Sequence, residues 1–161
     1  MHYYGVTRPR RSTLRRRPAV FLSLAACLAI VLLLLAACGP TGPTWVDSGA
    51  AYTTKSLPGA YAKADISGLA STPAADTTQL RHDALVGLRR RGGAASDAAD
   101  LITRTLPADS RGVPLYVERA TIDGSPGLIL VEAIGPSSAK LTTKRLWALS
   151  DKGAVLFVGT R

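Results

Sequence analysis

One uncharged apolar run near the start of the chain determines which part of it can fold in water. Residues 19–37 carry a single hydroxyl group, on Ser23, and no charge. At about 1.5 Å per residue, a helix of this length spans roughly 28 Å, close to the ~30 Å hydrocarbon core of a bilayer. The run is preceded by six arginines and no acidic residue; the arginines are Arg8, Arg10, Arg11, Arg15, Arg16 and Arg17. We therefore expect a water-soluble fold only beyond residue 37.

This order of charge and apolarity is typical of an export signal. Such signals consist of a basic segment, an apolar segment and small residues before a cleavage point. Positive-inside asymmetry keeps the arginine-rich end in the cytoplasm. Because the apolar run is long for a signal peptide, an uncleaved helix that anchors a single-span membrane protein is the alternative.

The end of the apolar run resembles the lipobox of bacterial lipoproteins. The pattern is one aliphatic residue, two small residues and a cysteine, here Leu35, Ala36, Ala37 and Cys38. The resemblance implies that Cys38 receives a diacylglyceryl group on its sulfur and that a signal peptidase cuts between Ala37 and Cys38. Leu35, Ala36 and Ala37 would be the residues that the peptidase recognises, and residues 1–37 would be the signal peptide.

Cys27 ends the same tetrapeptide, but its surroundings do not suit this chemistry. Ten apolar residues follow Cys27, so a chain cut there would begin with an apolar segment. Glycine and proline follow Cys38 instead. With Cys27 removed and Cys38 acylated, the exported part has no thiol for a disulfide or a cysteine metal site. We expect no cofactor and no metal apart from the covalent lipid on Cys38.

The distribution of charge argues against nucleic acid as a partner. The whole chain has a net charge of +9, which by itself suggests a nucleic-acid binder. From Cys38 onward, however, 14 Lys and Arg face 11 Asp and Glu, a balance of only +3. The basicity belongs to the leader. We expect the exported part to be lipid-anchored on the extracytoplasmic face of the cell membrane.

Residues 38–75 are rich in Gly, Pro, Ser, Thr and Ala, which predicts a flexible tether. Residues 57–72 within it are ambiguous and are compatible with a short helix docked on the domain. Trp45 and Tyr52 are exceptions to the polar composition. Their rings suit either the headgroup level of a membrane or packing onto the domain.

Residues 76–161 are expected to form a small α+β domain. Asp76 and Ser96 are candidate N-caps of two helices, each with an apolar face. After them the apolar period changes from 3.6 to 2, which predicts four strands at 113–122, 128–134, 141–149 and 154–160. The expected fold is thus two or three helices followed by a four-stranded antiparallel meander.

Two further features refine this expectation. Pro114 near the start of the first strand favours an edge position, because proline cannot donate a ladder hydrogen bond. The order of elements is similar to that of cystatin-like and nuclear-transport-factor-2-like rolls. This likeness concerns the fold and implies no activity.

The domain offers little for catalysis. His82, its only histidine, lies about 135° from the centre of the apolar stripe of its helix, and the neighbouring Asp83 points elsewhere. Glu118 and Glu132, on adjacent strands, are a candidate carboxylate pair. The competing interpretation is ordinary cross-strand pairing of these glutamates with Arg119, Lys144 or Arg145.

Arg89, Arg90 and Arg91 end the first helix, where cations favour the helix dipole. They are candidates for contact with an anionic surface, either lipid heads or acidic wall polymers, and the alternative is a solvated helix end. Taken together, the sequence predicts a non-enzymatic, lipid-anchored envelope protein whose domain binds an envelope protein, lipid or wall polymer. A small envelope enzyme built around His82 is the remaining alternative.

Overall fold

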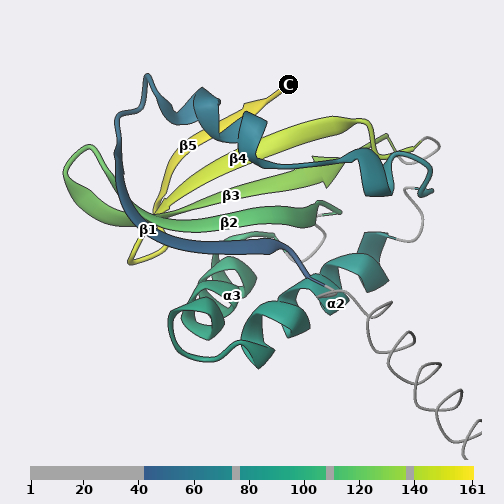
Figure 1. The fold of residues 1–161 in the computed structure, drawn as a ribbon, viewed down its shortest axis with the longest axis horizontal. Helices are drawn as coiled ribbons and strands as arrows, with labels where there is room; N and C mark the ends of the chain where they lie inside the picture. Colours follow the sequence, from purple (N-terminus) through teal and green to yellow (C-terminus); the bar gives the residue numbers. More distant parts are fainter. Residues whose placement is uncertain (1–41, 74–76, 108–110, 137–139) are drawn as a thin grey trace, which may run out of the picture. The chain divides into compact units, whose positions relative to one another are not determined.

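A computed structural model describes residues 42–73, 77–107, 111–136 and 140–161 (Figure 1). The chain divides into two units, Met1–Gly39 and Pro40–Arg161, and all described residues belong to the second. The signal-peptide residues, Cys38 and Asp76 therefore lie outside the described part. No helix within that part is long and apolar enough to cross a membrane.

Five strands form one mixed sheet in the order β1-β2-β3-β4-β5 (Figure 1). The strands are β1 Thr44–Tyr52, β2 Val113–Ile122, β3 Ser125–Ile134, β4 Thr143–Ser150 and β5 Val155–Thr160. β1 runs parallel to β2, whereas every other neighbouring pair is antiparallel. The expected four-stranded antiparallel meander is therefore wrong, because a fifth strand adds a parallel pair to the sheet.

The additional strand, β1, lies in the stretch that composition suggested was a tether. Its register with β2 shifts between Asp47 and Ala51, around Gly49, which adopts a φ of +62°. This irregularity breaks the alternation of side chains that normally reveals a strand. Trp45 and Tyr52 both pack onto the domain, on opposite faces of the sheet. Of the two interpretations of Trp45 and Tyr52, packing onto the domain is therefore the one that the structure shows, and both residues belong to β1.

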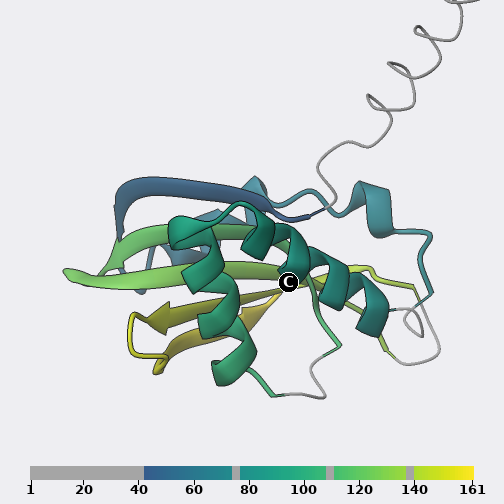
Figure 2. The same ribbon diagram turned by 90° about the horizontal axis from the view of Figure 1, so that it is seen from below.

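Helices cover both faces of the sheet (Figure 1), and Figure 2 looks onto the face covered by α2 and α3. On one face lie α2 (Thr77–Arg90) and α3 (Gly93–Thr105). The 3-10 helix η1 (Leu57–Lys63) packs on the other face, and a second one, η2 (Ser67–Leu69), follows it. The expectation that Ser96 caps the second helix is wrong. Gly92 holds the N-cap position with a φ of +70°, so Ser96 lies inside the first turn of α3.

Each face of the sheet buries its own apolar core. The core on the α2–α3 side joins residues of the helices to the sheet, for example Leu88, Ile102, Val117 and Leu130. The core on the η1 side is built in the same way, for example from Leu57, Tyr61, Ile129 and Leu146. Because the central strands are covered twice, β3 is buried from Gly127 to Ala133. Such a strand reads as a continuous apolar run.

β2 is an internal strand, so the expectation that Pro114 marks an edge is wrong. β1 pairs with β2 only from Tyr116 onward. The register between β2 and β3 also shifts between Pro114 and Tyr116. Pro114 therefore lies beyond the end of β1 and at an irregularity, where a missing backbone N–H is tolerated.

Candidate functional site

The structure does not gather the sequence-predicted site residues in one place. Cys38 and the three residues before it lie outside the described chain. His82 is exposed on α2, and the carboxylate of Asp83 accepts a hydrogen bond from Gln79 at 2.8 Å. Among the described residues, no group of three or more His, Cys, Asp or Glu side chains is arranged to hold a metal ion.

Glu118 and Glu132 are both fully buried, but they lie on opposite faces of the sheet. Glu118 shares its face with Tyr116 and therefore points to the η1 side. Glu132 shares its face with Leu130 and points to the α2–α3 side. The candidate carboxylate pair does not form, and each glutamate has its own set of partners.

Glu118 accepts hydrogen bonds from three different elements. From β1, Ser48 Oγ donates to Oε1 at 2.5 Å and Tyr52 OH donates to Oε2 at 2.8 Å. Tyr116 OH, on β2, donates to Oε2 at 2.8 Å. Lys63 Nζ of η1 completes the set with an ion pair to Oε2 at 3.0 Å. The carboxylate is thus fully satisfied and joins β1, β2 and η1.

The contacts of this cluster shift the pKa values of its titratable groups. Burial raises the pKa of Glu118, but its hydrogen bonds outweigh burial and hold the pKa below its ordinary value. The hydrogen bond with Tyr52, and then that with Glu118, raise the pKa of Lys63 in spite of burial. Burial and the hydrogen bond to Glu118 raise the pKa of Tyr116 to about 12. At neutral pH the cluster therefore holds no uncharged amine and no phenolate to act as a base.

Glu132 makes the corresponding link on the other face. Its Oε1 accepts a hydrogen bond from Arg81 Nη1 of α2 at 2.5 Å. Its Oε2 accepts hydrogen bonds from two residues of β4, Arg145 at 2.9 Å and Trp147 at 2.8 Å. The predicted cross-strand pair of Glu132 and Arg145 is confirmed. Glu118, in contrast, pairs with Lys63, which sequence reasoning missed because it lies in the stretch predicted to be a tether.

The three consecutive arginines have different environments. Arg89 Nε pairs with Asp100 Oδ1 of α3 at 2.9 Å, which joins the two helices. Arg91 donates to the backbone carbonyl of Pro43 at 3.1 Å, so the end of α2 lies beside the start of β1. Arg90 is exposed and has no ion-pair partner in the described part of the chain. Of the three arginines predicted to contact an anionic surface, Arg90 and Arg91 have no ion-pair partner in the described part of the chain.

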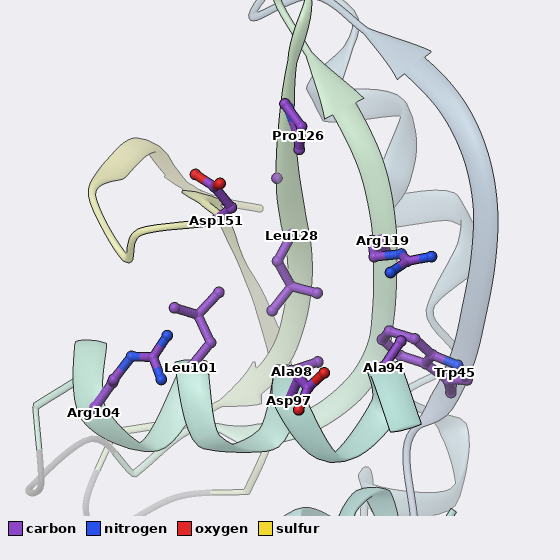
Figure 3. Close-up of a pocket in the computed structure, with 11 residues that line it drawn as sticks. Trp45, Ala94, Asp97, Ala98, Leu101, Arg104, Arg119, Pro126, Leu128 and Asp151 are labelled. Atoms are coloured by element: carbon purple, nitrogen blue, oxygen red, sulfur yellow. The ribbon is translucent and has the colours of Figure 1, made fainter. Parts of the chain in front are cut away.

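A small groove runs between α3 and the β2–β3 hairpin (Figure 3). Leu101 and Leu128 contribute to its apolar floor, and Trp45 and Arg104 lie at opposite ends. Its volume of about 170 Å³ is well below the ~300–1,000 Å³ of typical small-molecule sites. The groove has room for about one side chain and not for a cofactor.

A wider depression of about 410 Å³ lies beside α2 and the starts of β1 and β2. Leucines from three elements line it: Leu69, Leu80 and Leu115. Two carboxylates, those of Asp65 and Asp83, are its only charged lining groups. This charge does not suit an anionic ligand such as a phospholipid head.

Comparison with protein family models, with curated proteins and with solved structures finds no match to this chain. The likeness to cystatin-like and nuclear-transport-factor-2-like rolls therefore stays an expectation from the order of elements.

We predict that Glu118→Gln lowers the free energy of unfolding by about 2–3 kcal/mol at pH 7. The substitution removes the negative charge that pairs with Lys63 and replaces one acceptor oxygen with an NH₂ group. The folded-state pKa of Glu118 lies below its unfolded value. Its carboxylate therefore stabilises the fold above the unfolded pKa, and this contribution is lost as the pH falls through the folded pKa. In urea denaturation, the difference in free energy of unfolding between wild type and Glu118→Gln should become smaller below about pH 5. Exposed Asp97, changed to Asn, is the control; a difference that does not vary with pH would contradict the prediction.

Gly112 provides a test of the Glu132 cluster. A Cβ added there would overlap the carboxylate of Glu132. We predict that Gly112→Ala destabilises the domain by about 1–3 kcal/mol, because the buried carboxylate has no room to move. In the matched control Gly59→Ala, nothing lies within 4 Å of the added atom. Equal denaturation midpoints for the two variants would show that the carboxylate is not held tightly.

Proposed function

We propose that the chain is a lipid-anchored, non-enzymatic protein that displays a small binding domain on the extracytoplasmic face of the cell membrane. The proposal rests on the lipobox-like residues that end at Cys38. The start of the domain agrees with an anchor at this point, because β1 begins at Thr44, six positions after Cys38. Six residues extend at most roughly 22 Å. A lipid on Cys38 would thus hold the domain close to the membrane surface.

A non-catalytic role is supported by the environment of the titratable side chains. Glu118 and Glu132 each have several donors and serve to join elements of the fold. His82 is exposed, and its sequence neighbour Asp83 is bonded to Gln79. A general acid or base needs a pKa near the working pH and room for substrate beside it. The carboxylates of Glu118 and Glu132 are fully buried and occupied by their donors, so neither has such room.

We further propose that Arg90 and Arg91 contact anionic lipid heads beside the anchor. The hydrogen bond from Arg91 to Pro43 brings the basic end of α2 to the part of the domain that follows Cys38 in the chain. Each arginine near an anionic membrane surface contributes about 1 kcal/mol of attraction. Arg89 is left out of this surface because it pairs with Asp100.

The anchor is tested by the intact mass of protein extracted from membranes. We predict a chain that lacks residues 1–37 and carries added diacylglyceryl mass, and Cys38→Ala should abolish both changes. The uncleaved variant should remain in the membrane through residues 19–37, so the readout is the mass of the chain and not its release from the membrane.

Cys27→Ala is the matched control for this experiment. Its mature protein should have the same mass as the wild type, because Cys27 is removed with the signal peptide. A full-length, unacylated chain in every sample would overturn the lipoprotein proposal and favour a single-span membrane protein.

The surface role of the arginines is tested with the acylated protein, extracted from membranes and reconstituted into nanodiscs. We predict that anionic lipid slows amide hydrogen exchange at the end of α2 relative to neutral lipid. The double change of Arg90 and Arg91 to Glu should remove this effect. Arg104→Glu, at an exposed position near the end of α3, should leave it intact. Equal exchange in both lipids would contradict the contact.

A further inference from the structure

β5 exposes apolar side chains to an unusual degree for a soluble surface. Val155, Leu156 and Val158 are 49%, 46% and 52% exposed, and they are the large apolar residues that stand out on the described surface. All three belong to the strand at the end of the sheet opposite β1 (Figure 1). A cluster of exposed apolar residues on one element is a common mark of an interaction site.

The backbone of β5 offers free hydrogen-bonding groups beside these side chains. Lys144 and Arg161 exchange both of their backbone hydrogen bonds at 2.9 Å. In an antiparallel ladder such pairs alternate with pairs whose groups point away. With Trp147 opposite Val158 and Arg145 opposite Thr160, the N–H and C=O of Val158 and Thr160 point outward. β5 therefore has an open edge.

The other edge of the sheet is protected. In β1 a register shift follows Asp47, and Gly49 adopts a φ of +62°. Asp47 also forms an ion pair with Arg119 at 2.8 Å. Irregularities and charges of this kind prevent a further strand from pairing. Between Val155 and Thr160, β5 has neither a charge nor a proline.

Charge at the two ends of β5 indicates what kind of strand fits there. Lys152 and Arg161 flank the strand, both are exposed, and neither has an ion-pair partner among the residues that the structure describes. The carboxylate of Asp151, which precedes Lys152, lines the groove beside α3 (Figure 3). Antiparallel pairing of two copies would bring Lys152 of one copy toward Arg161 of the other, and these cations repel. A bilayer is also a poor occupant, because hydrocarbon leaves outward N–H and C=O groups unpaired. An uncharged strand with acidic ends would pair with the outward backbone groups of β5 and, through its carboxylates, with Lys152 and Arg161.

We propose that the outer edge of β5 binds an extended segment of a partner protein by strand addition. The segment has about five uncharged, β-branched or apolar residues with carboxylates at both ends. Backbone hydrogen bonds to Val158 and Thr160 supply affinity, and the exposed apolar side chains and flanking cations supply specificity. This inference goes beyond the proposed membrane anchoring and does not depend on a lipid at Cys38.

Two synthetic peptides test the proposal on the full-length protein in detergent micelles. One is Asp-Val-Thr-Val-Thr-Val-Asp, and the other carries Lys in place of both Asp residues. We expect the acidic peptide to bind at least about tenfold more tightly, because it pairs with Lys152 and Arg161. Its binding should slow amide hydrogen exchange at Val158 and Thr160. Equal affinities, or protection located elsewhere, would overturn the proposal.

A pair of edge variants separates binding from folding. Val158→Lys places a charge on the open edge and should weaken binding of the acidic peptide at least about tenfold. Ala51→Lys adds the same charge to β1, the protected edge, and should leave binding unchanged. A peptide N-methylated on the side that faces β5 should fail to bind the unaltered protein, which tests the backbone contact without any change in the fold.

Two other occupants would reveal themselves in the same samples. Self-association without peptide, detected by sedimentation and abolished by Val158→Lys, would assign the edge to a second copy and overturn the proposal. Protection of Val158 and Thr160 by anionic nanodiscs alone would assign it to the membrane, with the same consequence.

Discussion

The carboxylate of Glu118 is the interaction on which the N-terminal part of the fold depends. It draws Ser48 and Tyr52 of β1, and Lys63 of η1, to one buried point on β2. Ser48 and Glu118 are 70 residues apart in the chain, so closing this contact has a considerable entropic cost. An apolar residue at this position would fill the space but would not select these partners. The carboxylate therefore fixes which residues of β1 meet β2, a registry role that buried polar groups fill in other folds.

Glu132 has the corresponding role on the opposite face, where it joins α2 to β4 through Arg81, Arg145 and Trp147. The sheet is thus held to a covering element on each side by one buried acid. Both acids are fully used by these contacts and act as structural links between elements of the fold. The candidate sites accordingly lie at the end of α2, where Arg90 is exposed, and along β5, where Val155, Leu156 and Val158 are exposed.

Local patterns in the sequence predict the two helices α2 and α3 and the strands after residue 113, but not the strand β1 that precedes them. The Asp123-Gly124 turn has positive φ at both residues, as a two-residue hairpin requires. That turn pairs Ile122 with Ser125, and counting back along the ladder places Glu118 and Glu132 on opposite faces. The location of Glu118 and Glu132 on opposite faces of the sheet could therefore have been predicted from the sequence. The parallel pairing of β1 was not, because it depends on Lys63 and on contacts far apart in the chain.

The inequality of the two sheet edges has a consequence for assembly. Open-ended growth of a sheet requires that each added unit present a new edge to the next one. Here the register shift of β1 and the Asp47–Arg119 ion pair prevent a further strand from pairing with β1. The outer edge of β5 is therefore the one edge of this sheet to which a strand can be added. Even a pair of copies joined through β5 would expose only two closed edges. The fold thus permits capture of a single strand while terminating the polymerisation that leads to fibres.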